Sequence, residues 1–178
     1  MKRKAWWLAV ALLACAPVFA TQTVPATGAV PPAQLGKDRD GQVVDLGALH
    51  GKVVIVTFWA SWCGYCLKEL PVLNALQASV GDDWLRIIAV NVQDDTPAYR
   101  AMTRQMRDSK LTLTRDRSGR IARGYGVKAY PNLWLIDRQG RVWGHHVGYG
   151  EDSLETIVGE IQSLLKAEAQ AGQVNAAG

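Results

Sequence analysis

The sequence predicts an α/β fold in which helices cover both faces of a central mixed β-sheet. Short apolar runs alternate with longer segments of helical periodicity, a pattern typical of parallel strands joined by crossover helices. Near the C-terminus, two strand-like runs are separated only by the turn sequence Arg138-Gln139-Gly140, which predicts an antiparallel hairpin. The expected architecture therefore has three layers, with a sheet whose strands run in both directions.

The first half of the domain contains the strands that should lie at its centre. Residues 53–58 (VVIVTF) and 85–92 (LRIIAVNV) are continuous apolar runs, as expected of strands buried on both faces. A shorter strand at 42–46 precedes them. The segment 63–80 carries leucines at three- and four-residue spacings and predicts a helix, which Pro71 should kink because it removes one backbone donor.

The second half continues the alternation of helices and strands. Residues 97–108 predict an exposed helix with arginines on one side and Met102 and Met106 on the other. The remaining elements, in chain order, are a strand at 111–114, a helix at 118–125, hairpin strands at 132–136 and 141–147, and an amphipathic closing helix at 153–168.

The N-terminus has the order of features of a secretory signal peptide at residues 1–20. A basic start is followed by a short apolar run and by the small-residue cleavage sequence Val18-Phe19-Ala20. The run is too short to span a bilayer comfortably, although retention as an uncleaved anchor stays open. The sequence Leu12-Leu13-Ala14-Cys15 also resembles a bacterial lipobox, in which Cys15 would be acylated. Either route places the domain outside the cytoplasm, and we expect a bacterial periplasm.

The rest of the chain divides into a spacer at 21–34, a domain at 35–168 and a flexible tail at 169–178. The spacer is rich in Pro, Ala and Thr, and its prolines argue against a regular element, while the tail has no apolar face. The 178-residue chain has 20 basic and 16 acidic residues, but three of the basic ones lie in the signal peptide, which leaves 17 against 16. This near balance predicts neither nucleic acid nor an anionic membrane as a partner.

Cys63 and Cys66 are the only cysteines outside the signal peptide. They close too small a loop to brace a fold, so a C-x-x-C in an exported chain predicts a redox-active pair. The strand 53–58 leads towards Cys63 and places its sulfur at a helix N-terminus, where unpaired N–H groups and the helix dipole stabilise a thiolate. We expect Cys63 to attack a substrate disulfide and Cys66, one turn deeper, to resolve the mixed disulfide.

Half of a zinc site is another interpretation of two cysteines at this spacing. Such a site needs two further ligands, and the candidates are His50, His145 and His146. None of them has a partner at metal-ligand spacing, and the two adjacent histidines of a strand point to opposite faces. We therefore expect no metal, and no cofactor besides the Cys63–Cys66 disulfide.

The sequence FWASWCGYCLKELP at residues 58–71 resembles the active-site region of the bacterial TlpA/ResA-like periplasmic thioredoxins, which include the cytochrome c maturation thioredoxins. The similarity covers roughly residues 35–165. A second landmark at residues 125–140 resembles the family segment that contains a cis-proline, here Pro131, preceded by a residue that pairs with the substrate chain, here Tyr130. The resemblance implies a thioredoxin-like fold, exported proteins with thiols or disulfides as substrates, and a membrane protein as electron donor.

The comparison with plain thioredoxin also reveals departures. The 65 residues from Cys66 to Pro131 exceed the thioredoxin interval and leave room for one extra helix–strand unit, as in this periplasmic branch. By gapless matching, a buried Asp and a Lys of plain thioredoxin are replaced here by Thr57 and Val90. The usual proton acceptor for Cys66 is therefore missing.

Glu69 is the candidate that could take over this role. It matches a Glu of the family motif and could accept a proton from Cys66 if it is partly buried near the sulfur. The alternative is a solvent-facing helical Glu that pairs with Lys68 or Lys52.

The dipeptide Gly64-Tyr65 between the cysteines is the larger departure. Reducing family members usually carry a Pro just before the second Cys, whereas Gly-Tyr resembles the active site of periplasmic disulfide isomerases. We expect a monomeric reductase of the cytochrome c maturation type. The alternatives are a disulfide oxidase or isomerase and, third, a Cu(I)-binding module.

Aromatic residues surround the predicted site. Trp62, Tyr65 and Tyr130, together with Gly64 and Pro131, are the candidates for an apolar surface that binds an extended substrate. Trp59 is instead expected in the core.

Overall fold

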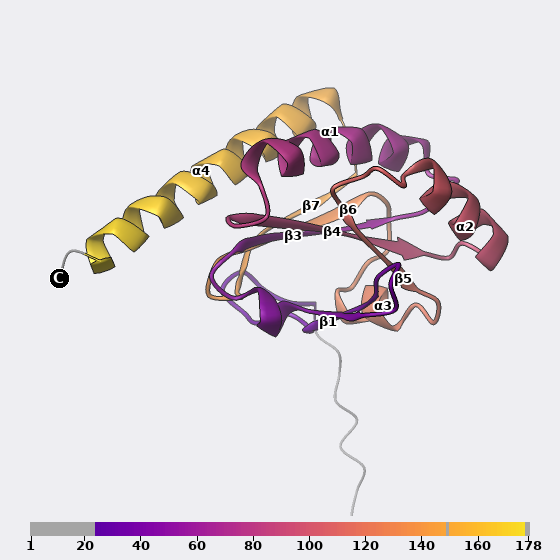
Figure 1. Ribbon diagram of the computed structural model, residues 1–178, viewed down its shortest axis with the longest axis horizontal. Coiled ribbons are helices and arrows are strands. Elements are labelled where there is room, and N and C mark those ends of the chain that lie inside the picture. Colours follow the sequence, from indigo (N-terminus) through magenta and orange to yellow (C-terminus); the bar gives the residue numbers. More distant parts are fainter. Residues whose placement is uncertain (1–23, 149, 177–178) are drawn as a thin grey trace, which may run out of the picture.

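The computed structural model describes residues 24–148 and 150–176 (Figure 1). Within these ranges the chain forms a seven-stranded sheet in the order β2-β1-β5-β4-β3-β6-β7. The predicted signal peptide at 1–20, including Cys15, lies outside the described residues. No helix of the described ranges is both long and apolar enough to cross a membrane.

Three parallel strands form the centre of the sheet: β3 (Val53–Trp59), β4 (Leu85–Val92) and β5 (Thr112–Asp116). Every residue of β3 is buried, as its continuous apolar and β-branched sequence predicts. The predicted hairpin is formed by β6 (Asn132–Ile136) and β7 (Val142–Val147). Because β6 pairs antiparallel with β3, the sheet is mixed, as expected.

Helices cover both faces of this sheet. On one face lie α1 (Gly64–Val80), α2 (Thr96–Gln105) and α4 (Glu151–Ala176), and Figure 1 shows α1 and α4 on the same side of the strands. The other face is covered by α3 (Arg120–Gly124) and the short 3-10 helix η1 (Leu46–Leu49). The two hydrophobic cores that result confirm the predicted three-layer, thioredoxin-like arrangement.

The extra helix–strand unit consists of α2 and β5. Strand β5 extends the sheet next to β4 and runs parallel to it. Helix α2 begins after Asp95, whose side chain accepts a hydrogen bond from the N–H of Ala98 (2.8 Å). Met102 and Met106 pack against the core, so the predicted division of this helix into an arginine side and a methionine side is confirmed.

The N-terminal spacer is the main difference from the prediction. The N–H of Gly28 donates to the carbonyl of Val142 (2.7 Å), and the hydroxyl of Tyr125 donates to the carbonyl of Pro32 (2.8 Å). Strand β1 (Gln34–Lys37) follows and pairs with β2 (Val43–Asp45). The ordered domain therefore begins within the predicted spacer. A proline lacks the N–H but its carbonyl still accepts, so an extended Pro-rich segment can line a domain surface.

The closing helix also differs from the prediction at its end. Helix α4 continues to Ala176, where the sequence predicts a flexible tail at 169–178. This segment lacks an apolar face but contains four Ala and two Gln, which have high intrinsic helix propensity.

Candidate active site

Cys63 and Cys66 form a disulfide at the N-terminus of α1, with their Cα atoms 5.3 Å apart. Cys63 is the N-cap residue, and its Sγ accepts a hydrogen bond from the N–H of Cys66 (3.2 Å). A backbone N–H directed at this sulfur favours the thiolate once the bond is reduced. Cys63 keeps 7% of its surface exposed and Cys66 none, so Cys63 is the sulfur that a substrate can reach.

Glu69 lies one turn further along α1 and is only 1% exposed. The hydroxyl of Thr57, on β3, donates to its Oε2 at 2.8 Å. Burial raises the pKa of Glu69 to about 7, and the Thr57 hydrogen bond offsets part of that rise. The alternative of a solvent-facing Glu69 paired with lysine is therefore wrong.

The position of Thr57 explains one departure from plain thioredoxin. The sequence comparison treats Thr57 only as the replacement of a buried Asp. In the structure Thr57 is fully buried and holds a carboxylate that comes from the facing helix. A buried acidic group is thus retained beside this strand, but it is supplied by Glu69 instead of β3.

The peptide bond between Tyr130 and Pro131 is cis, as the resemblance implies. Tyr130 contacts Trp62 edge to face, with ring centroids 5.8 Å apart. Trp62 and Tyr65 are 62% and 58% exposed, whereas Trp59 is fully buried in the core, as predicted. Trp62 and Tyr65 therefore leave large apolar rings exposed in the segment that carries the disulfide.

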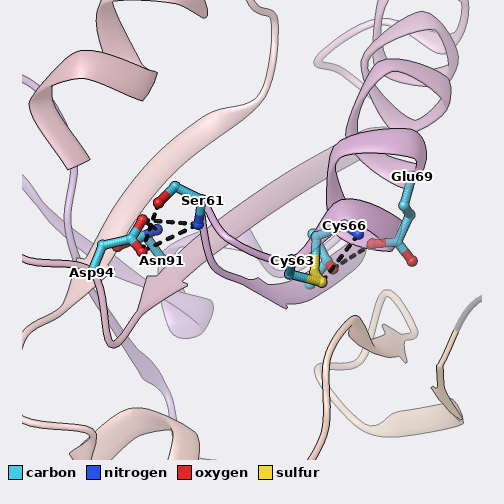
Figure 2. The surroundings of a disulfide bond; sticks show 7 residues. Ser61, Cys63, Cys66, Glu69, Asn91 and Asp94 are labelled. Atoms are coloured by element: carbon cyan, nitrogen blue, oxygen red, sulfur yellow. Dashed lines mark hydrogen bonds between the residues drawn. A yellow bond between two sulfur atoms is a disulfide. The ribbon is translucent and has the colours of Figure 1, made fainter. Parts of the chain in front are cut away.

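A largely buried polar cluster supports the loop that leads into the disulfide, and its residues were not among those predicted from the sequence. The carboxylate of Asp94, 8% exposed, accepts from the N–H of Ser61 (3.0 and 3.2 Å), the hydroxyl of Ser61 (3.0 Å) and the side-chain amide of Asn91 (2.7 Å) (Figure 2). Ser61 lies two residues before Cys63, so these bonds fix the approach to the active-site helix. Polar residues at the carboxyl end of the apolar run 85–92 were the available signal, because carboxyl ends of parallel strands share one edge of the sheet.

The two adjacent histidines point to opposite faces, as predicted. His145 stacks on Trp134, with ring centroids 3.8 Å apart, and burial together with the neighbouring His146 lowers its pKa. His146 contacts Glu160 of α4 at 2.7 Å. Among the described residues, no group of three or more His, Cys, Asp or Glu side chains is placed to hold a metal ion.

Comparisons with known proteins identify the family. Residues 22–160 match the Redoxin family. The thiol-disulfide oxidoreductase ResA of Bacillus thuringiensis is 33% identical over 105 residues, which are 59% of this chain and 60% of that protein. A thiol:disulfide interchange protein DsbE homolog of Paracoccus denitrificans is 32% identical over 154 residues, 79% of this chain and 82% of the relative.

The fold comparison agrees with the sequence comparison. A crystal structure described as a thiol:disulfide interchange protein DsbE from Chlorobium tepidum superposes with a TM-score of 0.70 and 32% identity. The superposition covers 80% of this chain and 99% of that one. The chain therefore belongs to the Redoxin family, as a TlpA/ResA-like member with a thioredoxin-like fold.

Proposed function

We propose that this protein is an exported thiol–disulfide oxidoreductase that reduces disulfides in other exported proteins, in the manner of a cytochrome c maturation reductase. The observation that carries the proposal is the Cys63–Cys66 disulfide at the N-terminus of α1, in which Cys63 keeps 7% of its surface exposed and Cys66 none. Family membership supports the same reaction class.

The reaction is a two-step thiol–disulfide exchange. The Cys63 thiolate attacks one sulfur of the substrate disulfide, forms a mixed disulfide and releases the first substrate thiolate. The Cys66 thiol then loses its proton, attacks the Cys63 sulfur and releases the second substrate thiolate. The substrate gains two electrons and two protons, and the protein is left as the disulfide. A dithiol donor, which we place in the membrane, must reduce it again.

Glu69 is proposed as the group that accepts the Cys66 proton. Its carboxylate is buried on the side of α1 that carries the disulfide (Figure 2). With a pKa of about 7, Glu69 exchanges a proton near neutral pH, which is the condition for efficient general acid–base catalysis there. A carboxyl with an ordinary pKa would be too weak a base for a thiol.

The substrate surface is proposed to consist of Trp62, Gly64, Tyr65, Tyr130 and Pro131. The exposed rings would contact apolar side chains of an extended segment, while Gly64 leaves room above the disulfide, since no atom lies within 4 Å of where its Cβ would be. We place the protein in a bacterial periplasm, delivered by the signal peptide 1–20, with acylation at Cys15 as the alternative N-terminus.

The reduction potential of the Cys63–Cys66 couple tests the direction of electron flow. The measurement uses protein that begins at Thr21, titrated in a thiol redox buffer and followed by alkylation of free thiols. A value near about −270 mV supports a reductase that is kept reduced from across the membrane. A value near about −150 mV would contradict it and favour the oxidase or isomerase that the dipeptide Gly64-Tyr65 resembles.

A further inference from the structure

Charged side chains are unevenly distributed in this protein, although basic and acidic residues nearly balance over the exported part of the sequence. A groove of about 800 Å³ lies between β1, β5, α2 and the start of α3. Six basic residues line it: Lys37, Arg39, Arg100, Arg115, Arg117 and Arg120. Only two carboxylates, those of Asp38 and Asp116, lie among them.

Both carboxylates are already engaged by backbone N–H groups. Asp38 accepts from the N–H groups of Asp40 and Gln42, at 3.0 and 2.8 Å. Asp116 is buried and accepts from the N–H groups of Arg120 and Ala122, at 3.0 and 2.9 Å. None of the salt bridges within the described residues involves a groove residue. Six cations against two carboxylates leave the groove with a formal excess of four positive charges.

Arg115 is the fixed cation at the base of this groove. Its guanidinium donates to the carbonyl of Asp94 (2.7 Å) and to the hydroxyl of Thr96 (3.1 Å), and it lies over the ring of Tyr99 at 5.1 Å. Its Nε is buried and has no hydrogen-bond partner in the described chain. Since Asp94 also holds Ser61, the groove and the active-site loop share one hydrogen-bonded network.

The groove lies on the same edge of the sheet as the disulfide. Trp59 on β3 is paired with Asn91 on β4, and Asn91 is paired with Arg115 on β5. These three positions form one row across parallel strands, about 10 Å long at a strand spacing of roughly 4.8 Å. Cys63 lies four residues beyond Trp59, at the start of α1, so a segment of several extended residues, at roughly 3.3 Å each, would run along this edge from Cys63 towards Arg115. One bound polypeptide can therefore occupy the groove and present a cysteine to Cys63.

We propose that the groove binds an acidic segment of the protein that exchanges disulfides with Cys63, a proposal that rests on the function proposed above. The recognised feature is a run of Asp or Glu side chains a few residues away from the reacting cysteine. Bidentate pairing of arginine with carboxylates supplies the contacts, and the focused positive potential increases the association rate.

The position of the groove favours a peptide over an anionic membrane. The cations line an open groove between β1, β5, α2 and the start of α3. This groove adjoins the sheet edge where a protein substrate must dock for the exchange reaction. An anionic lipid surface is the competing occupant, and the test below separates the two.

The experiment compares two synthetic peptides, each closed by one disulfide. One carries four glutamates and the other four glutamines, beginning three residues from the nearer cysteine. Reduced wild-type protein is mixed with each peptide, and acid-quenched samples are separated by chromatography to give the exchange rate. We expect the glutamate peptide to react about tenfold faster at low ionic strength, with the ratio approaching one at high salt because the charges are screened.

Two variants of equal net charge locate the effect. Reversal of two exposed groove cations in Arg117→Glu/Arg120→Glu should abolish the preference for the glutamate peptide. Lys110→Glu/Lys166→Glu reverses two exposed cations outside the groove. If the groove and not net charge is responsible, the ratio of the two peptide exchange rates should stay within about twofold of wild type in this variant. Equal loss in both variants would overturn the proposal.

The outcomes also separate this proposal from the one on which it rests. Reduction of neither peptide would refute the oxidoreductase function itself, whereas equal reduction of both would refute only the acidic docking site. A second measurement tests binding to an anionic membrane. It is sedimentation with phosphatidylglycerol vesicles, with phosphatidylcholine vesicles as the control. Vesicle binding that requires Arg117 and Arg120, without any peptide preference, would assign the groove to a membrane surface and overturn the proposal.

Discussion

Two buried carboxylates flank the active-site segment, and they differ in what surrounds them. Asp94 receives hydrogen bonds from the backbone and hydroxyl of Ser61 and from Asn91. Glu69 receives one side-chain hydrogen bond, from Thr57, and is otherwise enclosed by the core under α1. The difference in donors distinguishes a carboxylate that fixes a loop from one whose pKa burial raises to about 7. We expect four effects from this difference, of which the largest concerns Glu69.

Glu69→Gln should lower the rate of disulfide reduction at pH 7.5 about a hundredfold, because it removes the proposed acceptor for the Cys66 proton. The measurement is the single-turnover reduction of a model disulfide by the prereduced protein. Glu155→Gln, an exposed change on α4, should react like wild type. If Glu69→Gln lowers the rate of disulfide reduction less than threefold, Glu69 is not the proton acceptor for Cys66.

The stability of the oxidised protein should fall as pH rises through the pKa of Glu69. Its pKa is about 7 when folded and about 4.3 when unfolded, so between these values the folded state binds the extra proton. The stabilisation is complete below the unfolded pKa and is lost as pH rises to and through 7, a change of about 4 kcal/mol for the difference between these two pKa values. Urea unfolding at several pH values measures it. If the unfolding free energy of Glu69→Gln depends on pH in the same way as that of wild type, the effect belongs to other groups.

Asp94→Ala should destabilise the protein by about 2–3 kcal/mol, because the partly buried donors of Ser61 and the buried amide of Asn91 lose their acceptor. The loss should be similar in the oxidised and reduced proteins, as expected of a structural clamp. Asp83→Ala, an exposed change in the turn before β4, serves as the matched control. Unchanged stability in Asp94→Ala would mean that water replaces the carboxylate without loss.

Thr57→Val should give the smallest effect, a change in the pH dependence of reduction. The Thr57 hydrogen bond lowers the pKa of Glu69, so removing it raises that pKa and moves the rate profile to higher pH. At neutral pH the rate should fall about fivefold, the factor that corresponds to a net hydrogen bond of about 1 kcal/mol. Thr57→Ser keeps the hydroxyl and should retain the wild-type profile, and an unshifted profile in Thr57→Val would contradict the assignment.

The sequence alone determined the features that depend on local pattern. Apolar runs defined the central strands, helical spacing placed Cys63 at a helix start, and the turn at 138–140 defined the hairpin. These features could be predicted because backbone periodicity and turn chemistry are encoded within a few consecutive residues.

Only the tertiary structure decided how distant residues act together. The pairing of Thr57 with Glu69, the Asp94 support of Ser61, the docking of the N-terminal segment on Tyr125 and the basic groove all join separate elements. A helix pattern shows that Glu69 is on one side of α1 but not what that side faces. Burial and charge environment are properties of the packed layers, and they convert an ordinary glutamate into a group with a pKa near 7.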